Sequence, residues 1–319
     1  MGMGAWQILL PSPSLYNTNL FVMHRVINNF LYSKKYAPYI FVLPFLVSFS
    51  LFFIFPIIST IIMSFQKVLI GSARFIGFDN YKRLINESFF NAIRTNIIYT
   101  VLTILYLIPV PIVIAVALNS KLLIGRNAFR AVLFLPSLIS IIVSGVAFRL
   151  LFGTGEFGFV NSLLQKLGLR PINWLLEYWP GMFIMVGLAC WRWTGVNIVY
   201  FLSGLQNIPK ELYESADIDG ANALDKFFYI TLPLLKPIII YVLTISIYGG
   251  FAMFGESFVY WNETMPGDIG LTIVRYIYQE AIQRNDLGYG SSIGIVLLVI
   301  VFGINIMQLK FFGIFRREQ

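Results

Sequence analysis

Six apolar stretches, each about as long as a lipid bilayer is thick, most constrain what this chain can fold into. A membrane-spanning helix needs about 20 predominantly apolar residues. Because backbone polar groups in lipid must be hydrogen-bonded within the segment, each stretch predicts a helix. Pro109 and Pro111 in the second stretch predict a kink there, since each removes a backbone donor. The stretches are Tyr39–Met63, Ile97–Leu118, Ala131–Phe152, Gly181–Leu205, Pro237–Tyr260 and Ile293–Phe312.

The composition agrees with an all-α polytopic membrane protein with six transmembrane helices. The 319 residues are 58% hydrophobic and only 12% charged, whereas about 25% is usual for soluble domains. One Cys and one His exclude a disulfide scaffold and leave little room for a metal site. The net charge of +8 is expected to hold loops against anionic lipid, and no nucleic-acid partner is expected.

Lysines and arginines in the connections predict the orientation. Three basic clusters fall on the same side of a six-span chain: Arg25, Lys34 and Lys35; Lys121, Arg126 and Arg130; Lys310, Arg316 and Arg317. Basic loops face the cytoplasm, so both termini are predicted to be cytoplasmic, with tails at 1–36 and 313–319. The loop 64–95 argues against this, because it is also basic; it is longer, however, and contains Asp79 and Glu87.

An acidic segment, 211–233, stands out on this apolar chain. It holds five of the fifteen carboxylates: Glu211, Glu214, Asp217, Asp219 and Asp225. We predict a helix over 211–217, a turn at Asp219-Gly220, and a second helix over 221–230 that Pro233 closes. The small residues Ala216, Gly220 and Ala221 would let another surface approach closely. From composition alone, a solvated loop is the simpler interpretation.

The order of residues favours a docking segment instead. Glu214-Ser215-Ala216, then Asp219-Gly220-Ala221, then Phe227 and Leu232-Pro233, resemble the cytoplasmic signature loop of ABC-importer permeases, with Ser215 in place of an Ala. Two further stretches, 75–81 and 272–290, resemble external loops of permeases in sugar importers. The resemblance covers roughly residues 38–312, and it is nearest to permeases for oligosaccharides or polysaccharides, the alginate-uptake type among them.

The resemblance implies a type I ABC importer permease fold and a mechanism. The chain would be one half of a translocation pathway in a bacterial plasma (inner) membrane. Its core would be 92–312, preceded by a first helix and external loop at 37–91. The loop 208–233 would dock on an ATPase subunit and couple it to the pathway. The residues implied for coupling are Glu214, Ala216, Asp219, Gly220, Ala221, Phe227 and Pro233.

The same resemblance implies the partners. They are two ATPase subunits, a second permease that is a different chain, and an external solute-binding protein. The binding protein would touch the loops 64–95, 153–180 and 261–290. ATP and Mg would be bound by the partner ATPase. Consistently, the sequence contains no Gly-x-x-x-x-Gly-Lys-Ser/Thr phosphate-binding motif. We therefore expect a transport subunit without enzymatic activity or a cofactor of its own.

Charged residues at membrane depth are costly, so each suggests a function. Arg192 and Glu256 either line the saccharide pathway, or pair with each other or with a neighbouring subunit and only hold helices together. Arg149 is expected to be an interface anchor. Basic residues on the external side would suit an anionic uronate polymer. The residues predicted for the pathway are Trp191, Arg192, Trp193, Asn197, Tyr248 and Glu256.

Two other functions must be weighed. Gly290-Ser291-Ser292-Ile293-Gly294 matches the Gly-x-Ser-x-Gly nucleophile motif of hydrolases, but it opens a predicted membrane helix and the only His is His24. Small residues that ease helix packing explain it better. An ATP-independent carrier or channel would commonly show internal repeats, and none is evident between 39–152 and 181–312.

Overall fold

A computed structural model describes residues 33–69, 72–120, 123–153, 158–261 and 266–313. Most of both predicted tails lies outside these residues, as do His24, Lys121 and Arg316. The chain divides into two units, Met1–Ser59 and Thr60–Gln319, and each is described by itself.

The first unit contains one apolar helical stretch. It comprises α2 (Ala37–Phe49), the π-helical turn η1 (Ser50–Ile54) and the start of α3 (Phe55–Ser64). No side chain of α2 or η1 is buried within the chain. The stretch Ala37–Ser64 is long and apolar enough to cross a membrane, as predicted for the first span.

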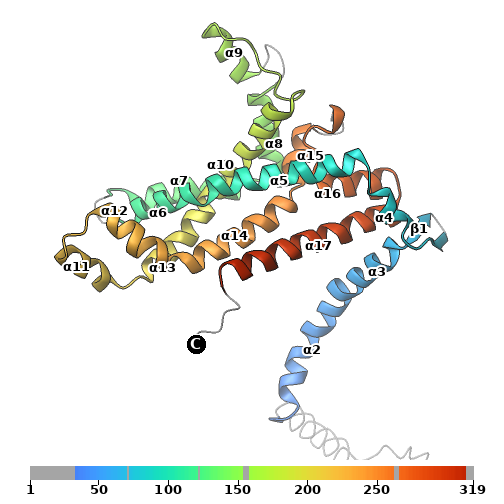
Figure 1. Cartoon of the computed structure of the whole chain (residues 1–319), viewed down its shortest axis with the longest axis horizontal. Helices are drawn as coiled ribbons and strands as arrows, with labels where there is room; N and C mark the ends of the chain where they lie inside the picture. Colours follow the sequence, from blue (N-terminus) through green and yellow to red (C-terminus); the bar gives the residue numbers. More distant parts are fainter. Residues whose placement is uncertain (1–32, 70–71, 121–122, 154–157, 262–265, 314–319) are drawn as a thin grey trace, which may run out of the picture. The chain divides into compact units, whose positions relative to one another are not determined.

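The second unit supplies the other spans (Figure 1). They are α5 (Glu87–Leu107) with α6 (Pro109–Asn119), α7 (Arg126–Leu138) with α8 (Ile141–Leu151), α10 (Tyr178–Gln206), α14 (Lys236–Phe251) with α15 (Gly255–Trp261), and α17 (Leu287–Phe311). Among the described residues, five helical stretches could cross a membrane, or six if α7 and α8 count as one. The six predicted spans are therefore all present as apolar helical segments.

Three of these spans are interrupted. The second span breaks at Ile108, directly before Pro109, as its prolines predict. The third bends by 94° between α7 and α8, so one straight helix over Ala131–Phe152 was a wrong expectation. The reason is local: Ile139 is extended, and the Ser140 side chain starts a new helix by accepting from the Ile142 N–H. The fifth span breaks at 252–254, between α14 and α15.

Small elements connect the spans. They are the antiparallel hairpin of β1 (Gln66–Leu69) and β2 (Ser72–Phe75), with α4 (Asp79–Arg83), α9 (Phe159–Lys166), η4 (Pro266–Asp268), α16 (Ile273–Ile277) and η5 (Tyr278–Gln283). The hairpin is a minor departure from the all-α prediction. The buried Asn80 side chain fixes it by donating to the carbonyls of Ser64 and Gln66, at 2.9 Å each.

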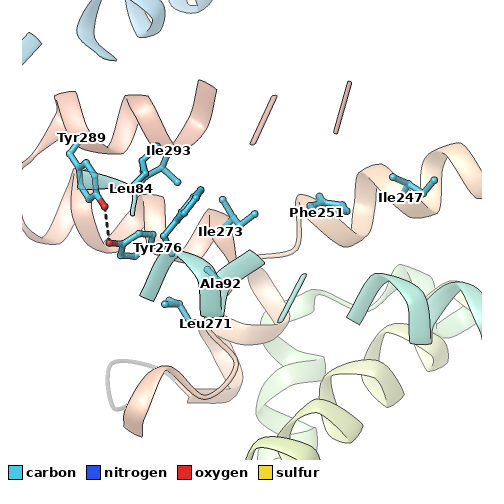
Figure 2. Close-up of a cluster of buried hydrophobic side chains, with 10 residues drawn as sticks. Leu84, Ala92, Ile247, Phe251, Leu271, Ile273, Tyr276, Tyr289 and Ile293 are labelled. Atoms are coloured by element: carbon cyan, nitrogen blue, oxygen red, sulfur yellow. Dashed lines mark hydrogen bonds between the residues drawn. The ribbon is translucent and has the colours of Figure 1, made fainter. Parts of the chain in front are cut away.

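Three groups of buried apolar side chains form the core of the second unit. The first, shown in Figure 2, joins α5, α14, α16 and α17, and its Tyr276 and Tyr289 hydroxyls lie 3.0 Å apart. The second joins α6, the later half of α10, and α14, and it includes Ile112, Phe201, Leu235 and Val242. The third lies around Met182, Tyr260 and Trp261.

The closest helix packing in this unit is made by α10. A Cβ placed on Gly195 would meet the carbonyl oxygen of Leu133 in α7, so the two backbones touch where Gly195 has no side chain. By contrast, a Cβ on Gly187 of the same helix would meet nothing within 4 Å.

Candidate functional site

The acidic segment folds as two helical arms. The first arm is α11 (Lys210–Ile218), and the second comprises α12 (Ala223–Lys226), η3 (Phe227–Thr231) and α13 (Leu232–Leu234). The predicted turn is present, with Gly220 at φ +79°. Pro233 does not close the second arm as predicted, because it occupies the first turn of α13, where no backbone donor is needed.

The second arm begins later than predicted because Asn222 caps it. The Asn222 Oδ1 accepts from the N–H groups of Leu224 and Asp225, at 2.8 and 3.0 Å. The Asp225 carboxylate in turn accepts from the Asn222 N–H, which completes a capping box. Asp217 forms an ion pair with Lys226 and so links the two arms.

The outer surface of the two arms is acidic and apolar together. Glu211, Glu214 and Asp219 are exposed, and a Cβ on Gly220 would meet nothing within 4 Å. Ile218 is 88% exposed and Leu224 67%. Of the other predicted coupling residues, Ala216, Ala221 and Phe227 are half-buried and Pro233 is exposed.

The inner surface of the arms is fastened to the second core group. Tyr213, Phe227 and Ile230 pack against that group, and the Tyr213 hydroxyl lies 2.9 Å from the Thr231 hydroxyl. Since the same group contains Ile198 and Phe201 of α10, the arms and α10 share one packed body. The outer surface is therefore open, while the inner surface is packed against the spans.

A cavity of about 480 Å³ lies among the spans. Five of the six residues predicted for the pathway line it, and Trp191 does not; its ring packs instead 5.7 Å from that of Phe148. The lining residues come from α5, α8, α10, α14 and α15, and they are Tyr99, Thr103, Leu107, Ile141, Ala189, Arg192, Trp193, Asn197, Ile245, Ser246, Tyr248, Gly249, Gly250, Ala252, Met253, Phe254, Gly255 and Glu256.

Arg192 and Glu256 face each other in this cavity. The Arg192 Nη1 lies 3.6 Å from the Glu256 Oε1, and their side chains are only 14% and 11% exposed. The Arg192 Nη2 donates to the Ile139 carbonyl at 3.5 Å, at the break between α7 and α8. The two alternatives that the sequence left open are thus combined, because the residues pair with each other and also line the cavity.

The break in the fifth span borders the cavity and has dedicated hydrogen-bond partners. The Asn96 Nδ2 donates to the Gly250 carbonyl at 2.7 Å, and the Asn96 Oδ1 accepts from the Ile273 N–H at 2.8 Å. The Thr272 hydroxyl donates to the Met253 carbonyl at 2.8 Å. The freed backbone groups are therefore satisfied from α5 and from the start of α16.

Sequence reasoning missed several lining residues. Ser246 is a single polar residue on an apolar helix, whereas Tyr99 and Thr103 follow Asn96 at helical spacing on one face of α5, a signal that was not used. The Gly249-Gly250 pair was a usable signal, because two adjacent glycines weaken a helix. A Cβ on Gly250 would collide with the Thr100 side chain, which explains why this position has none.

Two buried charges outside the spans were also missed. Arg275 is 2% exposed and donates to the Ser257 backbone carbonyl and hydroxyl; burial lowers its pKa to about 10. Glu280 is 3% exposed and pairs with Arg284. Burial raises the pKa of Glu280, although Arg284 and Arg83 oppose this.

The Gly-x-Ser-x-Gly stretch has no hydrolase geometry. It lies within α17 and not at a strand-to-helix turn, which that motif requires. The Ser292 hydroxyl donates to the Tyr289 carbonyl at 2.7 Å. A Cβ on Gly290 would meet Ala281 of η5, so the small residues serve packing, as the sequence suggested.

Comparison with known proteins agrees with this architecture. Residues 83–311 match the family described as binding-protein-dependent transport system inner membrane component. The chain is 54% identical to the arabinooligosaccharides transport system permease protein of Bacillus subtilis (strain 168), over 90% of this chain and 92% of that one. It is 51% identical to the protein of the same name from Halalkalibacterium halodurans, over 90% and 91%.

A solved structure shows the same fold. A chain in the crystal structure of a bacterial ABC transporter involved in the import of the acidic polysaccharide alginate matches with a TM-score of 0.76 and 27% identity, over 90% of this chain and 99% of that one. This likeness confirms the predicted type I importer permease fold. The protein belongs to the family of inner-membrane permease components of binding-protein-dependent ABC transport systems.

Proposed function

We propose that this permease forms half of the pathway of an importer for arabinose-containing oligosaccharides. The observation that carries the proposal is the 54% identity, over 90% of the chain, to a permease named for arabinooligosaccharides. Because the match covers 90% of the chain, it includes helices that line the cavity.

The cavity supports a sugar substrate on chemical grounds. Trp193, Tyr248 and Phe254 offer ring faces, on which the apolar faces of a sugar can stack. Asn197 and Ser246 offer hydrogen-bonding groups for hydroxyls. The volume of about 480 Å³ suits a small ligand. Trp193 and Tyr248 are 44% and 63% exposed within this one chain, so we infer that a second permease completes the wall.

The two arms provide for coupling to an ATPase. We propose that their outer surface, around Gly220, docks on one of two ATPase subunits, which bind the ATP and Mg, and that Glu214, Ala216, Asp219, Ala221 and Phe227 shape that contact. The exposed Ile218 and Leu224 support this, because apolar side chains among acids suit a protein partner more than bulk water.

The remaining features of the assembly follow from the family. We propose an external solute-binding protein that delivers the saccharide, a location in the bacterial inner membrane, and cytoplasmic termini. The three basic clusters at 25–35, 121–130 and 310–317, which fall on the same side of a six-span chain, support this orientation.

An acidic polysaccharide is a second candidate substrate. The structural likeness to an alginate importer favours it, although the 27% identity is half of that to the permease named for arabinooligosaccharides. The two substrates differ in charge, and transport of each can be measured separately.

Co-purification and reconstitution test the proposal. The tagged chain is solubilised gently from its host, and the proteins that accompany it are identified by mass spectrometry. We expect an ATPase with a phosphate-binding loop and a second permease. In proteoliposomes with the binding protein, arabinotriose should stimulate ATP hydrolysis and enter the vesicles. Uptake by the chain alone, without ATP, would indicate a carrier or channel instead.

A further inference from the structure

The charge of the cavity carries an inference about which saccharides can pass. Among the described residues that line it, Arg192 and Glu256 are the ones with a formal charge. They lie on different spans, α10 and α15, and their opposite charges cancel. The cavity therefore contains an arginine but no net charge.

We propose that Glu256 determines specificity for uncharged saccharides, because it occupies the guanidinium of Arg192 that would otherwise bind a substrate carboxylate. This inference rests on the proposed function. It adds a selection step inside the membrane to whatever selection the binding protein makes outside.

The contacts of Arg192 show which part of its guanidinium faces Glu256. An arginine presents two terminal nitrogens that together match a carboxylate. Here Nη1 faces the Glu256 Oε1 at 3.6 Å, and Nη2 donates to the Ile139 carbonyl at 3.5 Å. The ring of Trp193 lies 5.8 Å from the guanidinium carbon. A substrate carboxylate that approaches this guanidinium therefore also meets the carboxylate of Glu256.

Glu256 is held so that it cannot easily be displaced. Its neighbour Ser257 is completely buried; its hydroxyl donates to the Gly270 carbonyl at 2.6 Å, and its backbone carbonyl accepts from Arg275. On the other side, Gly255 lies so close to Ile141 that a Cβ there would approach it to 2.9 Å. The backbone on both sides of Glu256 is thus fixed, and from this position its carboxylate lies 3.6 Å from Arg192.

An anionic saccharide would then meet an unfavourable site. Its carboxylate would lose water and would lie near the Glu256 carboxylate without a cation of its own. Like charges brought together in a partly dry site repel each other, and this repulsion disfavours the charged sugar. A neutral sugar pays no such penalty, because its hydroxyls need only hydrogen bonds.

The test compares arabinotriose with its aldonic acid, in which the reducing end is oxidised to a carboxylate and its ring is open. The alditol of arabinotriose, which is neutral and has the same open-chain end, is measured beside them as the control for ring opening. Uptake of each is measured in proteoliposomes that contain the whole transporter. Binding of each sugar to the solute-binding protein is measured separately by calorimetry, and uptake is measured at saturation, so that the ratio reports on the permease.

Three variants isolate the pair. The wild type should transport arabinotriose about tenfold faster than the aldonate. In Glu256→Gln the ratio of arabinotriose uptake to aldonate uptake should fall towards one, because Arg192 becomes available to the aldonate. In Glu256→Asp, which keeps the charge, the preference should persist. In the double variant Arg192→Gln/Glu256→Gln the cavity has neither charge, and the aldonate should again be rejected.

The outcomes separate this inference from the proposed function. A Glu256→Gln ratio equal to that of the wild type would overturn the inference. If Glu256→Gln transports neither sugar, the double variant decides: recovered arabinotriose transport with rejection of the aldonate supports the inference, and equal loss overturns it. If the wild type does not carry arabinotriose, the proposed function fails. The same comparison is then made with a neutral sugar that it does carry and the aldonate of that sugar.

Discussion

Asn96→Ala should weaken the break in the fifth span more than its single small side chain suggests. Asn96 is completely buried, and it satisfies the Gly250 carbonyl and the Ile273 N–H at once. The Gly250 carbonyl lies in the last turn before the break, and the Ile273 N–H lies at the N-terminus of α16, so both depend on Asn96 as a partner from outside their own helix. Removing the amide therefore leaves one buried acceptor and one buried donor without a hydrogen-bond partner.

The expected magnitude follows from these two groups. A side-chain hydrogen bond between membrane helices contributes about 0.6 to 1.7 kcal/mol. A buried polar group left without a partner costs about 1 to 3 kcal/mol. Asn96→Ala leaves two such groups without a partner. We therefore expect it to lower the free energy of unfolding by about 3 kcal/mol, close to twice the upper value for one hydrogen bond between membrane helices.

Thr103→Ala is the matched control on the same helix. Its hydroxyl is buried too, but it donates to the Tyr99 and Thr100 carbonyls of its own helix, at 2.9 and 3.0 Å. Those carbonyls lie in the regular helix, so the loss should stay below about 1 kcal/mol. Unfolding of the purified permease in detergent, followed by denaturant titration, measures both. Equal losses for the two variants would refute the view that the break depends on Asn96.

Three further expectations can be checked in the same preparations. Gly195→Ala should prevent stable assembly, because its Cβ meets a carbonyl of α7, whereas Gly187→Ala in the same helix should fold normally; detergent-soluble yield and thermal midpoint compare them. Gly220→Trp should insert normally but lose the ATPase on co-purification, while Gly168→Trp, with a similar positive φ and equally open surroundings, should retain it; loss in both would indicate backbone strain instead. Burial raises the pKa of Glu280, so the stability it contributes is largest at acidic pH and is lost as pH rises through that pKa; Glu280→Gln should flatten the slope of thermal midpoint against pH, and an unaltered slope would contradict this.

The sequence predicted the spans and the acidic segment because both depend on local patterns. Apolar length alone marks a helix in lipid, and Asp219-Gly220 marks a turn. The break after Leu138 was missed, because the mean hydropathy stays high across it, although Pro136 and Ser140 interrupt the apolar run on either side. Its cause is a capping hydroxyl and a packing partner on α10, and neither is visible in a hydropathy pattern.

The site was only partly predictable for a similar reason. Arg192 and Glu256 stand out because charge at membrane depth is rare, whereas Trp191 was included only for its position next to Arg192. Helical periodicity turns Trp191 away from the cavity and brings its ring against Phe148. Asn96 gave no signal of its function, because its partners, Gly250 and Ile273, are more than 150 residues away, at sequence separations of 154 and 177.

The three interrupted spans have a mechanical consequence, because their breaks lie at the level of the cavity. Leu107, Ile141 and the residues 252–254 line it, and each borders a break. Stiff rods joined at one level act as levers with a common pivot. The 16 residues of α14 make a rod about 24 Å long. A push of about 4 Å at its far end, beside the two arms, turns it by about 10° at the pivot. The walls would thus change their angle at the cavity, while the packing within each rod stays intact.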